Sequence, residues 1–103
     1  MTVRLANSVT SEVIVVDRFP SLVGRAPEAN IPLDDAKIGN YQCMIDRTHL
    51  GLVIWDLGTV CGTRVNGVPV TKAILNPNDE ITIGRFSFRL LFEPTRRAAT
   101  RML

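Results

Sequence analysis

The sequence predicts an all-β fold, a sandwich or barrel built from short strands. Apolar or alternating runs of a few residues recur, and turn signals separate them about every 8–12 residues. Asn66-Gly67 lies between two short valine-containing runs, which is the strongest short-range signal for a β-hairpin. In contrast, no stretch keeps apolar residues at the helical period of about 3.6 residues over about three turns.

The expected strands can be justified along the chain. Residues 13–16 are consecutive β-branched residues, and residues 50–57 are the strongest candidate because Val-Ile-Trp at their centre favours extended structure. Residues 81–83 and 86–90 alternate apolar and polar side chains, as half-buried strands do. The other expected strands are residues 22–23, 31–33, 41–46, 63–65 and 68–70.

The charge of the chain is unevenly distributed. The net charge is +2, yet residues 94–103 contain three arginines and no acid, whereas residues 1–93 contain nine basic and ten acidic residues. We therefore expect one near-neutral domain over residues 1–93 and a flexible basic tail over residues 94–103. A near-neutral domain argues against nucleic-acid binding, which needs a basic folded face.

Composition excludes several other classes of function. No apolar run reaches the about 18 residues of a membrane span, and the N-terminus lacks a signal peptide, so we expect a cytoplasmic protein without membrane insertion. His49 is the only histidine, and the two cysteines, Cys43 and Cys61, lie far apart in the sequence. We therefore expect no metal site, no cofactor and no enzymatic activity. Whether Cys43 and Cys61 form a disulfide is left open by the sequence.

Three segments carry a resemblance to a known family. LVGRAPEANIPLDD, VIWDLGTVCGTRVNGVPV and LNPNDEITIGRFSFRLLF follow one another in the order and spacing of a forkhead-associated (FHA) domain, over roughly residues 13–93. The resemblance implies a β-sandwich of two twisted sheets with about eleven strands. It also implies a non-enzymatic module whose loops, at one end of the sandwich, bind phosphothreonine in a partner protein.

The resemblance also assigns roles to two loops. The family's phosphate-binding arginine falls on Arg25, preceded by Gly24, and a guanidinium fork suits a phosphate. The family's Ser-x-x-His element begins at Gly39, which lacks the serine hydroxyl. Asn40 keeps an amide donor, and Gln42 can replace the histidine as an internal support of the loop. Without the resemblance, a solvated surface arginine would be the better explanation of Arg25. Ordinary turn chemistry explains Asn40 and Gln42 as well as a functional role does.

The next family loop, Ser-Thr-Asn-Gly-Thr, falls on the five residues that begin at Thr59. Thr59 fits this loop as an expected ligand contact, and Gly62 fits it as a support. Val60 and Cys61 do not fit, because they cannot replace the family's threonine and asparagine as hydrogen-bonding groups. Asn66 is expected to support the adjoining hairpin.

These residues predict a protein-interaction module with a weakened phosphothreonine site. A hydrogen bond to a charged group contributes about 1.5–3 kcal/mol, so the missing hydroxyl at Gly39 alone costs about ten- to a hundredfold in affinity. The expected ligand contacts are Arg25, Asn40 and Thr59, and the expected partner is a protein or a phosphothreonine-containing peptide. The alternative is a degenerate FHA domain that serves as a phospho-independent scaffold or oligomerisation module in a larger assembly.

Overall fold

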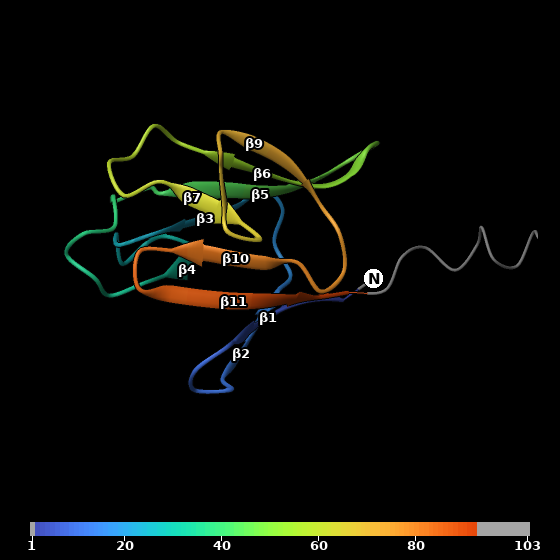
Figure 1. Cartoon of the computed structure of the whole chain (residues 1–103), viewed down its shortest axis with the longest axis horizontal. Helices are drawn as coiled ribbons and strands as arrows, with labels where there is room; N and C mark the ends of the chain where they lie inside the picture. The colour runs from blue at the N-terminus through green and yellow to red at the C-terminus, as the bar shows by residue number, and fades with distance from the viewer. Residues whose placement is uncertain (1, 93–103) are drawn as a thin grey trace, which may run out of the picture.

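The computed structural model describes residues 2–92, which form eleven strands and no helix (Figure 1). The strands are β1 (Val3–Asn7), β2 (Val13–Val16), β3 (Ser21–Gly24), β4 (Ile31–Pro32), β5 (Cys43–Thr48), β6 (Gly51–Asp56), β7 (Thr63–Val65), β8 (Val68–Val70), β9 (Lys72–Leu75), β10 (Glu80–Ile83) and β11 (Phe86–Leu91). Every strand that we expected from the sequence is present, with shifts of a few residues at some ends.

The strands form two sheets that pack against each other. Six strands form one sheet in the order β2-β1-β11-β10-β7-β8, and five form the other in the order β4-β3-β5-β6-β9. Neighbouring strands run antiparallel, apart from the parallel pair β3 and β4. The two-sheet sandwich expected from the sequence is therefore confirmed.

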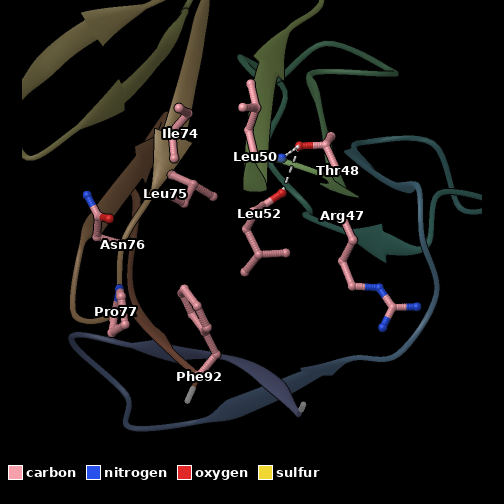
Figure 2. A pocket seen from close by; sticks show the side chains of 10 residues that line it. Arg47, Thr48, Leu50, Leu52, Ile74, Leu75, Asn76, Pro77 and Phe92 are labelled. Carbon is pink, nitrogen blue, oxygen red and sulfur yellow. Dashed lines mark hydrogen bonds between the residues drawn. The ribbon is translucent and has the colours of Figure 1, made fainter. Parts of the chain in front are cut away.

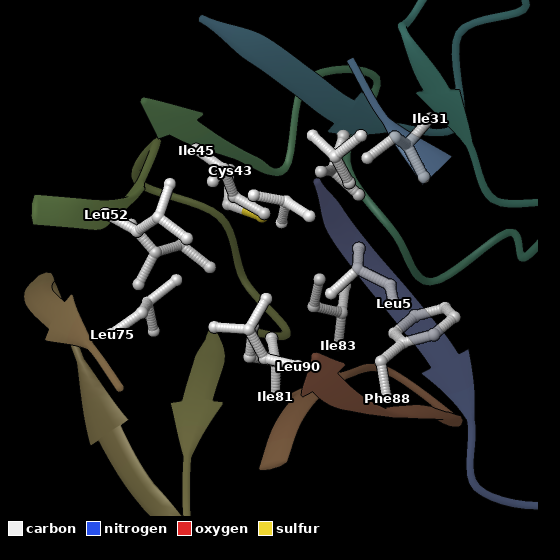
Figure 3. Close-up of a cluster of buried hydrophobic side chains, with 14 of the residues drawn as sticks. Leu5, Ile31, Cys43, Ile45, Leu52, Leu75, Ile81, Ile83, Phe88 and Leu90 are labelled. Carbon is white, nitrogen blue, oxygen red and sulfur yellow. The ribbon is translucent and has the colours of Figure 1, made fainter. Parts of the chain in front are cut away.

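The hydrophobic core lies between the two sheets and consists mainly of alternate residues along the strands (Figure 3). In β10, Ile81 and Ile83 are buried, whereas Thr82 between them is only partly buried. Val53 is 1% exposed but lies outside this core, because alternation turns it to the opposite face of β6 from its neighbours Leu52 and Ile54. Some of the apolar strand residues thus cover the outer face of a sheet instead of filling the core.

Two strands were not expected from the sequence. β1 buries Val3 and Leu5 and pairs with both β2 and β11, so it completes the larger sheet. β9 pairs with β6 at the edge of the smaller sheet and buries Leu75.

No helix in the described part of the chain is long and apolar enough to cross a membrane. The tail expected over residues 94–103 lies outside the described residues.

One end of the sandwich gathers the connections that resemble the family's binding loops. The β3–β4, β4–β5 and β6–β7 connections and the β10–β11 turn all lie at the left in Figure 1. The pairing registers explain this arrangement: the end of β3 lies opposite the start of β5, and the start of β7 lies opposite the end of β10. Short rigid strands therefore hold residues from four separate segments within one surface.

The opposite end of the sandwich contains a cavity of about 570 Å³ (Figure 2). Leu50, Leu52, Leu75 and Phe92 form the apolar part of its lining, and Arg47 lies at its side. The β5–β6 turn beside it is closed by the Thr48 hydroxyl, which donates to the Gly51 carbonyl at 3.0 Å. His49 is exposed in this turn, at the other end of β5 from the loops just described.

Candidate functional site

Backbone contacts join the β3–β4 loop to the β4–β5 loop. The amide of Arg25 donates to the carbonyl of Gly39 at 3.0 Å, and the amide of Ala26 donates to the carbonyl of Asn40 at 3.2 Å. Gly24 makes this approach possible, because a Cβ atom there would lie 2.0 Å from the Asn40 carbonyl oxygen. Arg25 and Asn40 are therefore held side by side by the backbone, independently of their own side chains.

Gly24→Ala should destabilise the domain and separate these two loops. A clash with a backbone atom cannot be relieved by a side-chain rotation, so we expect a loss of about 2–3 kcal/mol in the free energy of unfolding, measured by urea denaturation. Gly58→Ala is the matched control, because nothing lies within 4 Å of a Cβ atom there and only the positive φ of 77° is strained. Equal losses in the two variants would contradict the proposed role of Gly24.

Gln42 is the central support of the site. Its side chain is completely buried, and its Nε2 group donates to the Thr59 hydroxyl at 2.6 Å and to the Gly62 carbonyl at 2.8 Å. Its Oε1 atom accepts from the Gly39 amide at 3.0 Å and from the Cys61 thiol at 3.4 Å. One neutral side chain thus ties the β4–β5 loop to the β6–β7 loop, the kind of internal support anticipated from the sequence.

Asp56 is a second support, which was not expected from the sequence. One carboxylate oxygen accepts the hydroxyls of Thr59 and Thr63 at 3.0 and 2.8 Å. The other accepts the amides of Gly58 and Thr59 at 3.0 and 3.2 Å. The sequence did carry a signal, because an aspartate followed closely by a Gly-Thr pair is typical of a turn in which the carboxylate accepts nearby backbone amides.

Acid should loosen the β6–β7 loop through Asp56. Burial raises the pKa of this carboxyl, but hydrogen bonds from Thr63, Thr59 and Gly58 together outweigh burial and leave the pKa below the usual 3.8. Because the unfolded chain then binds the proton more readily, the contribution of Asp56 to stability is full above pH 3.8 and is lost as pH falls through the lower, folded pKa. NMR shifts of Thr59 and Thr63, followed down to about pH 2, should report this loss. Asp56→Asn should abolish the transition, and an unchanged transition in that variant would refute the assignment.

The structure brings Arg25 and Asn40 to the surface and leaves their side chains unengaged. Both are exposed, and neither side chain takes part in an ion pair within residues 2–92. Thr59 differs, because its hydroxyl accepts from Gln42 and donates to Asp56. The hydroxyl proton of Thr59 is therefore not available to a ligand, and the geometry places this residue among the supports of the site.

The two other residues expected as supports lie in different places. Gly62 lies at the site, where its carbonyl accepts from Gln42 and its φ of 75° suits a glycine. Asn66 lies at the far end of β7 from the β6–β7 loop, with a φ of 53°. Its side chain bonds Asp79 and the amide of Glu80 at 2.9 Å each, so it supports the β7–β8 hairpin against β10 instead of the site.

Further groups surround the site. Val60, at the tip of the β6–β7 loop, is fully exposed. Beside that loop, a cavity of about 490 Å³ is lined by Asp35, Lys37, Cys61, Gly84 and Arg85. Arg85 also makes an ion pair of 3.5 Å with Asp35, which fixes the β10–β11 turn against the β4–β5 loop. The surroundings of the site therefore combine charged side chains of both signs with one prominent apolar side chain.

The two cysteines do not form a disulfide. Both are free thiols, Cys43 buried and Cys61 half-buried. Burial raises the pKa of Cys43 to about 12, so this thiol stays protonated and unreactive at neutral pH. Among the described residues, no group of three His, Cys, Asp or Glu side chains is placed to hold a metal ion.

Comparisons with known proteins agree with this geometry. The model of the FHA domain family matches residues 22–84, which is more than half of the chain. The chain belongs to the FHA domain family. An oxoglutarate dehydrogenase inhibitor of Corynebacterium diphtheriae is 34% identical over 82% of the chain and 57% of its own length. The glycogen accumulation regulator GarA of Mycobacterium tuberculosis is 33% identical over 76% of the chain and 47% of its own length. The chain thus spans about half the length of these relatives.

Solved FHA domain structures share the fold. The EmbR protein of Mycobacterium tuberculosis, in complex with a low-affinity phosphopeptide, superimposes with a TM-score of 0.86 at 22% identity, over 91% of this chain and 25% of EmbR. The N-terminal FHA domain of Rad53p from S. cerevisiae, in complex with a phosphothreonine peptide, gives a TM-score of 0.80 at 18% identity and covers both chains completely. At these identities the likeness establishes the fold alone, and the ligands are those of the two proteins named.

Proposed function

We propose that this FHA domain is a non-enzymatic module that binds a partner protein by recognising phosphothreonine at its loop end. The observation that carries the proposal is the pair of exposed side chains Arg25 and Asn40, which backbone hydrogen bonds hold together on two neighbouring loops. A phosphothreonine carries a charge of about −1.5 to −2 and three acceptor oxygens at pH 7. The guanidinium of Arg25 can donate two parallel hydrogen bonds to it, and the amide of Asn40 can donate another.

The proposed binding is weak, because several positions at the site provide no donor. Gly39 has no side chain, and Val60 has no polar group. The thiol of Cys61 points to Gln42, and the hydroxyl proton of Thr59 is bound to Asp56. Two remaining side chains, each contributing about 1.5–3 kcal/mol, together give about 3–6 kcal/mol, which corresponds to a Kd between several millimolar and about 40 μM. Phosphothreonine recognition is therefore retained in a weakened form.

The partners of the relatives suggest the cellular role. The relatives are named as an inhibitor of oxoglutarate dehydrogenase and a regulator of glycogen accumulation. We infer that the present chain likewise acts by docking on a protein whose activity it changes. Arg25 and Asn40 lie on two loops that backbone hydrogen bonds join, which supports a single docking event that engages both.

NMR titration of the ¹⁵N-labelled domain tests the function directly. A library of phosphothreonine peptides should shift the resonances of Arg25 and Asn40, whereas the unphosphorylated peptides should shift them much less. Binding that does not depend on phosphorylation would instead favour a phospho-independent scaffold.

The fully exposed Val60 at the loop tip favours the role of a phospho-independent scaffold, because an apolar side chain gains about 1.5–3 kcal/mol on burial in a partner. Val60→Ser should weaken binding to an unphosphorylated partner and leave the affinity for phosphothreonine peptides largely unchanged.

A further inference from the structure

The glycine at position 39 is not explained by its backbone conformation. Five described glycines have a positive φ, and Gly39 is not one of them, so its backbone accepts any residue. The space around it is the restriction. A Cβ atom at position 39 would lie 2.9 Å from the Cγ2 methyl of Thr59, closer than such contacts occur in proteins. The next atoms, Gln42 Oε1 and Thr59 Cβ, would lie at ordinary distances of 3.6 and 3.7 Å.

The Thr59 methyl cannot easily move away. The hydroxyl on the same carbon accepts from Gln42 Nε2 at 2.6 Å and donates to Asp56 Oδ1 at 3.0 Å. Rotating the side chain to move the methyl would break both hydrogen bonds and leave the completely buried Gln42 without one of its acceptors. The network that supports the two loops therefore also fixes the position of the methyl.

We propose that Gly39 and Thr59 form one unit that sets the affinity of the site for phosphate. The Thr59 methyl fills the volume that a side chain at position 39 would need, and so keeps a hydroxyl out of the β4–β5 loop beside Arg25 and Asn40. A serine at position 59 would keep both hydrogen bonds of the hydroxyl and vacate that volume. The two positions can therefore change together at little cost, whereas a change at position 39 alone is obstructed. The effect on phosphate rests on the proposed function, but the steric coupling does not.

The steric coupling is tested by a double-mutant cycle that needs no ligand. Gly39→Ala should lower the Tm by about 5–15 °C in the protein that keeps Thr59, as overpacking does. In the Thr59→Ser protein the same change should lower the Tm by less than about 3 °C. Thr63→Ser, which removes a methyl from the other threonine bound to Asp56, is the matched control and should give no relief. Equal Tm losses from Gly39→Ala with and without the Thr59→Ser substitution would overturn the proposal.

The effect on affinity is tested with phosphothreonine peptides by isothermal titration calorimetry. The Gly39→Ser/Thr59→Ser variant should bind at least about tenfold more tightly than either single variant, because it gains a hydroxyl donor to a charged group. Suppose that Thr59→Ser reduces the Tm loss caused by the change at position 39, but the double variant binds the peptide no more tightly. That result would overturn the proposal that the two residues set the affinity for phosphate. Failure of the unmodified domain and of every variant to bind any phosphothreonine peptide would refute the proposed function, and the Tm cycle would then still decide whether the two residues form a unit.

Discussion

Gln42→Glu should destabilise the domain by about 3–5 kcal/mol at pH 7 and abolish binding at the loop end. The two side chains have the same shape, so packing is preserved and the donor is lost. An oxygen would replace Nε2 opposite the Thr59 hydroxyl and the Gly62 carbonyl. The new carboxylate would also face Asp56 Oδ1, which lies 3.5 Å from Nε2. A completely buried carboxylate, with one oxygen facing a carbonyl and a second carboxylate, therefore replaces a fully bonded amide.

Urea denaturation at several pH values measures this loss. Burial and the nearby Asp56 carboxylate should raise the pKa of the introduced carboxyl in the folded state above its unfolded value of about 4.3. The folded variant then holds this proton more tightly than the unfolded chain does. The free energy of unfolding should therefore partly recover as pH falls through the raised pKa of the folded state. Gln42→Met is the neutral control, with an expected cost of about 1–3 kcal/mol and no such pH dependence. A glutamate variant as stable as the methionine variant at pH 7 would contradict the role assigned to the Nε2 donor.

The strands could be predicted where local chemistry decides them. Asn66 and Gly67 adopt φ values of 53° and 81°, as the hairpin signal requires, and β7 and β8 lie at the expected residues. β1 and β9 were missed because they carry no such signal. β1 has only Val3 and Leu5 as inward residues, and β9 begins with Lys72 and Ala73. Both are strands because neighbours distant in sequence pair with them.

The candidate site likewise has some features that the sequence predicts and others that depend on contacts between distant residues. The exposed positions of Arg25 and Asn40 and the supporting role of Gln42 could be anticipated, because the family pattern fixes their place in the loops. The partners of Gln42 could not, since Thr59 and Gly62 lie 17 and 20 residues further along the chain and meet it only when β5, β6 and β7 are in register. For the same reason Thr59 was expected as a ligand contact, although its hydroxyl is used inside the protein.

Arg25→Ala should weaken phosphothreonine-peptide binding by about ten- to a hundredfold and change stability by less than about 0.5 kcal/mol. The guanidinium is exposed, and the backbone amide, which holds the loop to Gly39, remains in the variant. Arg25→Lys should retain only part of the affinity, because an ammonium group cannot donate a planar pair of hydrogen bonds to phosphate. Calorimetry with one phosphothreonine peptide gives the affinities of the unmodified domain, the Arg25→Ala variant and the Arg25→Lys variant. Urea denaturation gives the free energy of unfolding of each protein.

Arg4→Ala provides the matched control for charge. Arg4 is exposed on β1, where it pairs with Val15 and Leu91, so its removal lowers the net charge by the same amount at a distance from the loops. A general electrostatic attraction would make the two alanine variants equally weak, and raising the salt concentration would abolish the binding of both. A bidentate contact at Arg25 instead predicts a large loss in that variant alone, and most of the loss should persist at high salt. Gly39 offers no hydroxyl, and the hydroxyl of Thr59 is already bonded to Gln42 and Asp56. We therefore expect Arg25 to carry a larger share of the phosphate affinity than it would in a site with those two donors.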